Sequence, residues 1–168
     1  ELAAASAGIT LGVYCHVVLA LTAIARIGNE EQKQRYLAPG IRGEQIGAFG
    51  STEAGAGSDI TAIATRAVRD GDDYVLNGAK LFCTNSPIAD FIVLSAVTAP
   101  EKSGGGISLF IVDRSTPGLS ISRVIKTLGM HPAQTAEVVL ENVRVFKANR
   151  LGEEKSRRAE HADGFCRG

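Results

Sequence analysis

The fold is decided by residues 44–59, which read EQIGAFGSTEAGAGSD. The apolar run at residues 46–51 has the length of a β-strand, and it ends in a turn made of small residues. Before this stretch the chain is rich in Ala, Leu, Val and Ile over long spans, and after it the apolar runs are short. The stretch therefore marks the change from a helical part to a β part.

The part before it predicts two helices. Residues 1–27 are mostly Ala, Leu, Val and Ile without Pro, which favours a helix, and their apolar character nearly all round predicts a buried one. Asn29 with Gln32 three positions later has capping-box chemistry, so a second helix is expected from residue 30 to about Leu37, ended by Pro39 and Gly40. We expect a helical hairpin. His16, which has no second ligand at helical spacing, is interpreted as structural.

The part after it predicts strands. Their expected positions are residues 46–51, 65–70, 74–76, 80–84, 91–97, 107–112, 119–121 and 136–143. Asn77-Gly78 is the strongest signal for a tight hairpin turn, and further turns are expected at residues 71–73, 104–106 and 117–118. The apolar runs do not alternate between strands and helices, so a Rossmann fold is not expected. The predicted class is α+β, with an N-terminal helical hairpin followed by an antiparallel β-barrel or sandwich.

Composition excludes several functions. The 18 basic and 18 acidic side chains cancel, so no broad positive field is expected to bind nucleic acid or an anionic membrane. The three cysteines, Cys15, Cys83 and Cys166, are far apart, which argues against a disulfide framework and a C-x-x-C metal site. No basic leader opens the chain, and the apolar stretch at residues 11–25 is short and interrupted by polar residues. We expect a soluble, intracellular protein without a metal.

The small residues at positions 52–59 form a candidate anion site. Successive amides in a Gly-rich turn can point inward as a nest for phosphate oxygens, and the hydroxyls of Thr52 and Ser58 can donate hydrogen bonds. No Lys follows the glycines as in a P-loop, and the Gly-x-Ser-x-Gly arrangement of a nucleophile elbow is absent. Taken alone, a Gly-rich turn between strands is more often only a turn.

Several motifs in order resemble the acyl-CoA dehydrogenase family. Residues 44–59 resemble its first signature, whose core is Thr-Glu-Pro-Gly-x-Gly-Ser-Asp, and residues 76–85, LNGAKLFCTN, resemble its Asn-Gly-x-Lys-x-Trp-Ile-Thr-Asn segment. Residues 28–33, 110–112 with 116–118, 128–131 and 140–145 complete the series. The resemblance covers about residues 1–154.

This resemblance implies an enzyme that binds FAD and dehydrogenates an acyl-CoA thioester between its α and β carbons. In the family a base takes the α-proton, the flavin receives the β-hydride, and the electrons leave to an electron-transferring flavoprotein. The resemblance also implies a homo-oligomer. A cytoplasmic location follows for a bacterial protein, or the mitochondrial matrix for a eukaryotic one.

One group of residues matches positions along the flavin's pyrimidine edge: Phe49, Gly50, Ser51 and Thr52. Their backbone amides and the Thr52 hydroxyl would polarise the flavin's carbonyls and stabilise charge in the reduced ring. In the family's pattern a Pro often stands at the position of Ala54, so this loop is expected to be less rigid.

A second group matches positions around the ring and the substrate. Gly57 and Ser58 match the loop near the pyrophosphate and the acyl-CoA, with Ser58 as the substrate contact. Phe82, Cys83 and Thr84 match the family's Trp-Ile-Thr, where the aromatic ring covers the isoalloxazine and the Thr hydroxyl reaches the flavin's N5. Phe82 keeps a stacking face and lacks the indole donor.

The resemblance assigns no catalytic residue to this chain. The family's base is a glutamate on C-terminal helices, and nothing after residues 151–153 resembles those helices, so a fragment that is inactive alone is expected. The expected division is residues 1–43 for the end of the N-terminal helical domain, 44–153 for the middle β-domain, and 154–168 for an irregular tail. A non-catalytic flavin-binding or assembly remnant and a related acyl-CoA oxidase remain as alternatives.

Overall fold

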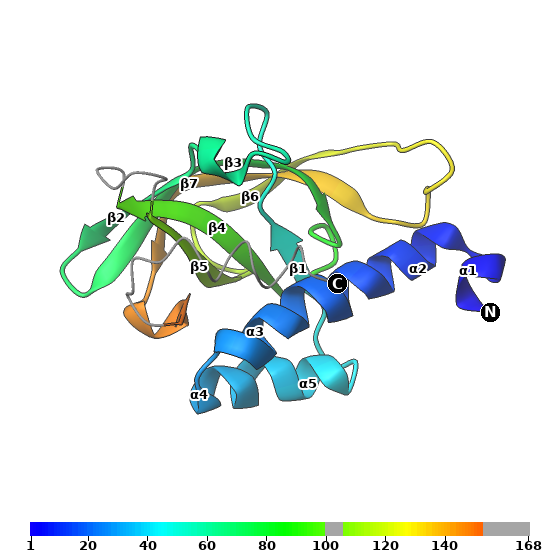
Figure 1. The fold of residues 1–168 in the computed structure, drawn as a ribbon, viewed down its shortest axis with the longest axis horizontal. Helices are drawn as coiled ribbons and strands as arrows, with labels where there is room; N and C mark the ends of the chain where they lie inside the picture. Colours follow the sequence, from blue (N-terminus) through cyan, green and yellow to red (C-terminus); the bar gives the residue numbers. More distant parts are fainter. Residues whose placement is uncertain (100–105, 153–168) are drawn as a thin grey trace.

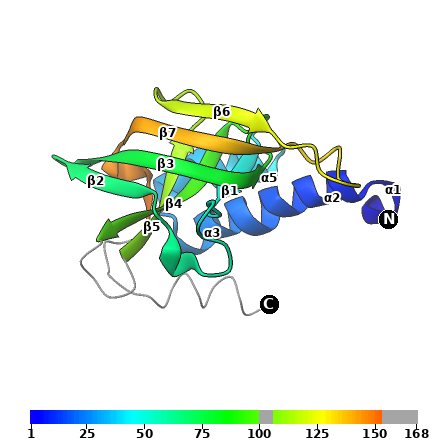
Figure 2. The same ribbon diagram turned by 90° about the horizontal axis from the view of Figure 1, so that it is seen from above.

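A curled β-sheet forms one layer of the protein, and a helical hairpin forms the other (Figure 1). The computed structural model describes residues 1–99 and 106–152. The prediction of an irregular tail at residues 154–168 lies outside the described residues, as does most of the turn expected at residues 104–106. The helices cover one face of the sheet beneath β1 and β4 (Figures 1 and 2).

The first helical stretch is interrupted once. A short α1 (Leu2–Ala5) ends at Ser6, whose backbone is extended and whose hydroxyl accepts a hydrogen bond from the Ile9 amide at 3.3 Å. A continuous helix follows, made of α2 (Ala7–Tyr14), a π-helical segment η1 (Cys15–Leu21) and α3 (Thr22–Ile27). Ser6 is an N-cap inside the span predicted as one helix.

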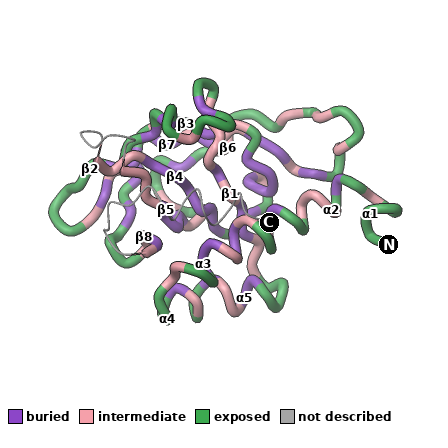
Figure 3. Tube along the Cα trace, viewed as in Figure 1, coloured by how far each residue is buried: buried purple, intermediate pink, exposed green. Residues whose placement is uncertain are grey.

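This helix is buried on one side only, so the prediction of burial all round was wrong for the described chain. In α2 only Gly8 is buried, whereas the neighbouring Ile9, Val13 and Tyr14 are exposed (Figure 3). The buried side meets the β6–β7 connection, because a Cβ added to Gly8 would lie 2.6 Å from Pro132 Cδ. One apolar face of α2 therefore has no cover within the described residues.

The stretch Ala7–Ile27 is long enough and apolar enough to cross a membrane, by length and composition alone. The core helix of a soluble protein and an N-terminal signal sequence meet the same criterion. Length and composition alone therefore assign no membrane role to this stretch, and 33% of its most apolar window is buried inside this chain. The expectation that the protein has no membrane partner stays a prediction.

The second arm of the hairpin begins as predicted and ends later. Asn29 and Gln32 form the expected capping box at the start of α4 (Glu30–Gln32). The helix continues through η2 (Lys33–Leu37) into α5 (Ala38–Ile41), so the predicted stop at Pro39 and Gly40 was wrong. Pro39 thus lies inside a continuous helical stretch, which lacks one backbone N–H donor at this residue and does not end there.

Six of the predicted strand positions are confirmed, the two strands predicted at residues 74–76 and 80–84 form a single strand, and one short strand was not foreseen. The strands are β1 (Gly47–Gly50), β2 (Arg66–Asp70), β3 (Asp73–Thr84), β4 (Phe91–Ala99), β5 (Gly106–Asp113), β6 (Leu119–Val124), β7 (Thr135–Val145) and β8 (Arg150–Leu151). Two short 3-10 helices, η3 (Ile60–Ala62) and η4 (Lys147–Asn149), lie in connections. The unforeseen strand is β8, whose two residues pair with β5.

The predicted antiparallel barrel or sandwich needs correction. The sheet runs in the order β6-β7-β3-β2-β4-β5-β8, with β1 also paired to β4, and it is not closed into a barrel. It is mixed, because β1 pairs with β4 in parallel and β2 meets β4 in parallel at Arg66 and Val97. The antiparallel hairpin of β2 and β3 lies between β1 and β4 in the chain, and β4 runs in the same direction as β1.

The predicted hairpin turn at Asn77-Gly78 was also wrong. Strand β3 runs straight through this dipeptide, with a register shift against β7 between Leu76 and Gly78. Gly78 has φ +151°, and an added Cβ would lie 2.5 Å from Thr65 Oγ1. The dipeptide therefore serves a β-bulge and a close backbone approach, while the tight turn lies at residues 71–72.

Strand β4 is buried on both faces and divides the core in two. Phe91 and Val93 pack with Ile24 and Tyr36 in the cluster between sheet and helices. Ile92, Leu94 and Ala96 belong to the cluster on the concave side of the sheet. Alternate side chains of one strand thus hold the two layers together, and β1 is fixed beside them.

Candidate functional site

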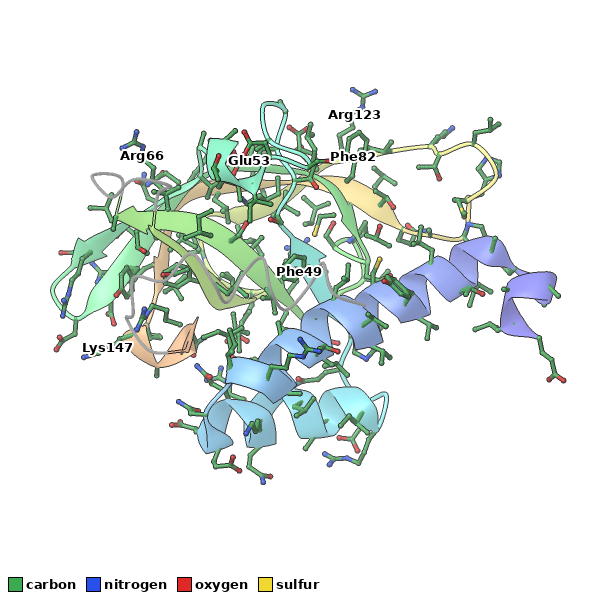
Figure 4. All side chains as sticks on the ribbon, viewed as in Figure 1. Phe49, Glu53, Arg66, Phe82, Arg123 and Lys147 are labelled. Carbon is green, nitrogen blue, oxygen red and sulfur yellow. The ribbon has the colours of Figure 1, made fainter. Side chains whose placement is uncertain are left out.

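The two sequence stretches assigned to the flavin meet at one end of the sheet. Residues 49–52 leave β1, and residues 82–84 end β3, so both stretches lie where a strand stops. The Leu81 amide donates to the Thr52 carbonyl at 2.8 Å, and the Cys83 thiol donates to the Phe49 carbonyl at 3.4 Å. The structure therefore brings both stretches into contact. Phe49 on β1 and Phe82 near the end of β3 are labelled in Figure 4.

The first stretch is held tightly against β4. Phe49 is half-buried and packs on the helix-facing cluster, and Gly50 is buried, since an added Cβ would lie 2.7 Å from Leu94 Cδ2. The Ser51 hydroxyl accepts a hydrogen bond from the Ser95 hydroxyl at 3.1 Å. Thr52 is half-buried at the point where the chain leaves the sheet. Apart from the half-buried Phe49, the stretch offers a ligand backbone groups and short polar side chains.

Phe82 is turned out of the sheet by a bulge. The β3–β7 register shifts between Lys80 and Cys83, and Phe82 has φ +54°, an uncommon value for a bulky residue. Its side chain is 59% exposed. An aromatic ring held outside the sheet by a strained backbone is a feature that a ligand-binding role would explain.

Cys83 faces the opposite way and is completely buried. Burial raises the pKa of its thiol to about 12, with hydrogen bonding to Ser86 acting against this. The thiol therefore stays neutral at physiological pH and is no nucleophile. Cys83 was predicted to contact the flavin, and because its side chain is buried, only its backbone could make that contact.

Thr84 belongs to a small buried network. Its hydroxyl lies 3.1 Å from the Thr135 hydroxyl, and Thr84 also hydrogen-bonds Cys15 on η1. Asn85, at φ +71°, donates from its amide group to the Gly12 carbonyl at 2.8 Å. The end of β3 is thus tied both to β7 and to the N-terminal helix, which fixes the position of Thr84.

Gly57 and Ser58 lie farther out on the same loop. Both are exposed, and a Cβ added to Gly57 would meet no atom within 4 Å. The loop folds back on itself through paired backbone hydrogen bonds between Glu53 and Ala56. Asp59 accepts hydrogen bonds from the Thr61 amide and hydroxyl, which caps η3. The backbone around Gly57 is open to a ligand.

A buried ion pair at the base of this loop was not predicted. Lys80 Nζ lies 2.6 Å from Glu53 Oε1, with side-chain exposures of 0% and 8%. Burial raises the pKa of Glu53, but hydrogen bonds from Lys80, Thr65 and Ala64 outweigh burial and leave this pKa below its ordinary value. The available signal was a lysine at an inward position of a predicted strand, since a fully buried lysine needs a partner.

The two histidines of the described chain have different surroundings. His16 accepts a hydrogen bond from the Gly47 amide at Nδ1 (2.9 Å), so its Nε2 carries the proton and donates to the Gly40 carbonyl at 3.2 Å. This places His16 as a structural link between the helices and β1. His131 is exposed and lines a groove of about 380 Å³ with Lys126 and Thr127. The described residues contain no group of three or more His, Cys, Asp or Glu arranged to hold a metal ion.

Comparison with known proteins covers nearly the whole described chain. Residues 48–143 match the family model of the acyl-CoA dehydrogenase middle domain, and residues 1–44 match that of the N-terminal domain. The short-chain specific acyl-CoA dehydrogenase of Clostridium acetobutylicum is 45% identical over 139 residues, which are 83% of this chain and 37% of that protein.

Solved structures agree with this match. Butyryl-CoA dehydrogenase from Megasphaera elsdenii superposes with a TM-score of 0.86 and 38% identity, over 89% of this chain and 39% of that one. The FAD complex of PigA superposes with a TM-score of 0.87 and 31% identity, over 94% and 41%. This chain thus spans about two fifths of the length of these relatives. Since the middle-domain model alone matches more than half of it, the chain belongs to the acyl-CoA dehydrogenase family.

Proposed function

We propose that the protein containing this chain dehydrogenates an acyl-CoA thioester between its α and β carbons, and that this chain supplies the flavin-binding side of the active site. The observation that carries the proposal is the contact between residues 49–52 and 82–84 at one end of the sheet, beside the open loop of Gly57 and Ser58. Each of these stretches matches a flavin or substrate position of the family.

The residues present suit FAD. The exposed ring of Phe82 offers a flat apolar face for a planar cofactor. The short side chains at residues 50–52 leave backbone amides and one Thr hydroxyl for a polar ring edge. The open backbone of Gly57 leaves room for phosphate oxygens. When bound, FAD supplies the acceptor for the hydride that leaves the β carbon.

The residues of this chain would hold and orient the FAD ring and the acyl-CoA. Thr52 and its neighbouring amides would form fixed dipoles at the ring's polar edge, where they stabilise developing negative charge without reorganisation. Ser58 would contact the acyl-CoA, and Phe82 would keep water from one face of the ring. The Thr84 hydroxyl is held between Thr135 and Cys15, which fixes its position relative to the ring that it would face.

Neither carboxylate of the loop is available as the base. Glu53 is bound to Lys80 and to two backbone amides, and Asp59 is used in the η3 cap. The pKa of both carboxylates lies below the ordinary value, Glu53 because its hydrogen bonds outweigh burial and Asp59 because Thr61 hydrogen-bonds it. We therefore place the base that takes the α-proton outside the described residues. An electron-transferring flavoprotein as acceptor, a homo-oligomer and a cytoplasmic location belong to the same proposal.

Two anaerobic mixtures test the proposal. The chain with FAD and a panel of acyl-CoA esters should keep its oxidised flavin absorbance, because general-base assistance typically contributes about 100- to 10,000-fold and both loop carboxylates are engaged within the described residues. A chimera in which residues 1–152 replace the aligned segment of the M. elsdenii butyryl-CoA dehydrogenase should bind FAD and bleach with butyryl-CoA. A Thr52→Val chimera is the matched control and should retain flavin less well.

The outcomes separate the alternatives. A folded chimera without flavin would contradict the proposal and favour a non-catalytic remnant. Bleaching by the chain alone, with enoyl-CoA formed, would show that the base lies within these residues. Rapid reoxidation of the bleached chimera by oxygen would favour an oxidase over a dehydrogenase that needs a protein acceptor.

A further inference from the structure

Lys80 is a fully buried lysine in the middle of β3, and it has three oxygen partners. Its ammonium lies 2.6 Å from Glu53 Oε1, 3.3 Å from the Ser95 hydroxyl and 3.4 Å from the Ser51 carbonyl. An ammonium has three donors, so these contacts use all of them. The charge is therefore fully engaged at the base of the loop that follows β1.

Glu53 holds the other side of the same loop. Its Oε1 also accepts from the Thr65 amide at 3.0 Å, and its Oε2 accepts from the Ala64 amide at 2.7 Å. The ion pair thus ties three points together: the start of the loop at Glu53, its end at residues 64–65, and β3 at Lys80. The exposed part with Gly57 and Ser58 lies between the tied ends.

The pair also sets the direction of one peptide group. The Ser51 carbonyl points toward the ammonium, and in a planar trans peptide the carbonyl and the next N–H point in opposite directions. The Thr52 N–H is therefore directed away from Lys80. The Thr52 carbonyl accepts from the Leu81 amide at 2.8 Å, which fixes the following peptide as well.

We propose that the buried Lys80–Glu53 pair is a positioning element that aims the Thr52 amide at the flavin and holds the substrate loop in place. The inference rests on the proposed function. A buried ion pair is weak evidence for stability, because desolvation of both charges offsets their attraction, and apolar replacements of both partners are often neutral. A role in fixing a unique geometry accounts for retaining two charges in this core.

The experiment uses the chain with FAD and three variants: Lys80→Met, Glu53→Gln and the double variant. Lys80→Met strands a buried carboxylate and could unfold the chain, whereas the double variant removes both charges and should fold. We expect the double variant to bind FAD at least 10-fold more weakly and to lose the shift of flavin absorbance that hydrogen bonding to the ring produces. Amides of Ala64, Thr65 and Leu81 should exchange faster with solvent.

Arg42→Met is the matched control, because Arg42 forms a bidentate but exposed ion pair with Glu44 at 2.7 and 2.8 Å. It should change neither amide exchange in the loop nor FAD binding. If the double variant binds FAD with wild-type affinity and spectrum, the inference fails while the proposed function stands. If the wild-type chain binds no FAD, the proposed function fails for this chain. Unchanged amide exchange with solvent at Ala64 and Thr65 in the double variant would overturn the inference that the Lys80–Glu53 pair holds the loop.

Discussion

The loop between β1 and β2 and the helical hairpin are attached to the same sheet by different means. The loop carries few apolar contacts and is held by the Lys80–Glu53 pair and backbone hydrogen bonds. The hairpin is held by an apolar cluster that includes Ile24, Tyr36 and Phe91, with His16 and Gln32 adding polar links. Charge fixes the geometry of the loop, whereas apolar area fixes the hairpin.

This difference predicts different responses to substitution. Apolar contacts are many and non-directional, so a single loss in the hairpin should lower stability without moving the proposed site. The loop depends on a few directional contacts, so a single loss there should alter geometry as well as stability.

The largest effect is expected at the loop anchor. Glu53→Gln leaves the Lys80 charge buried without its partner, which typically costs about 3 to 5 kcal/mol of unfolding free energy. Lys80→Met/Glu53→Gln should recover most of this loss. Urea unfolding of the two single variants and the double variant measures the coupling, and additive losses would mean that the two charges act independently.

A comparable but more variable loss of unfolding free energy is expected for a core substitution in the hairpin. Ile24 is fully buried between the helix and β4, and Ile24→Ala should cost about 2 to 5 kcal/mol through lost transfer energy and a cavity. Its FAD affinity, measured well below the unfolding midpoint, should match that of the wild type. A large loss of affinity in this folded variant would show that the two regions are not separable.

Alkaline pH should weaken the hairpin and the end of β3, because each holds a buried acid with a raised pKa. Burial raises the pKa of Cys83 from 9.0 to about 12, and burial with the nearby Asp113 raises that of Tyr36. The folded state binds these protons more tightly than the unfolded state, so stability is full below pH 9 and falls as pH rises from 9 toward 12. Urea unfolding at several pH values should give a shallower decline for Cys83→Ala. An equal decline would mean that Cys83 does not contribute.

The smallest effect is expected at the surface. Arg42→Met removes an exposed ion pair with Glu44, and such pairs contribute little to stability because solvent screens them. Added salt should reduce the difference between this variant and the wild type further. A loss as large as that expected for Ile24→Ala would show that Arg42 supports the hairpin by contacts other than its charge.

Local patterns were sufficient to place most elements. The capping box at Asn29 and Gln32 and the short apolar runs predicted helix and strand positions that the structure confirms. Strand direction was not predictable, because the apolar run of β1 carries no information about its parallel partner β4. Asn77-Gly78 misled for the same reason, since its role depends on Thr65, which lies far from it in the sequence.

The sequence motifs located the residues of the proposed site, but they did not predict the contacts that hold these residues in place. Residues 49–52 and 82–84 could be assigned from the resemblance, and the structure brings them together. The bulge that exposes Phe82 and the contacts of Lys80 with Glu53 and Ser95 depend on how the loop crosses the sheet. Such long-range contacts have no counterpart in local periodicity.

FAD affinity of three single variants tests the central claim most directly. Thr52 and Thr84 belong to the two stretches proposed to hold the flavin, whereas His131 lines a separate groove. Fluorescence titration of the chain with FAD should show weaker binding for Thr52→Val and Thr84→Val and near wild-type binding for His131→Ala. If His131→Ala weakens FAD binding more than either threonine variant, the flavin does not lie where residues 49–52 meet residues 82–84.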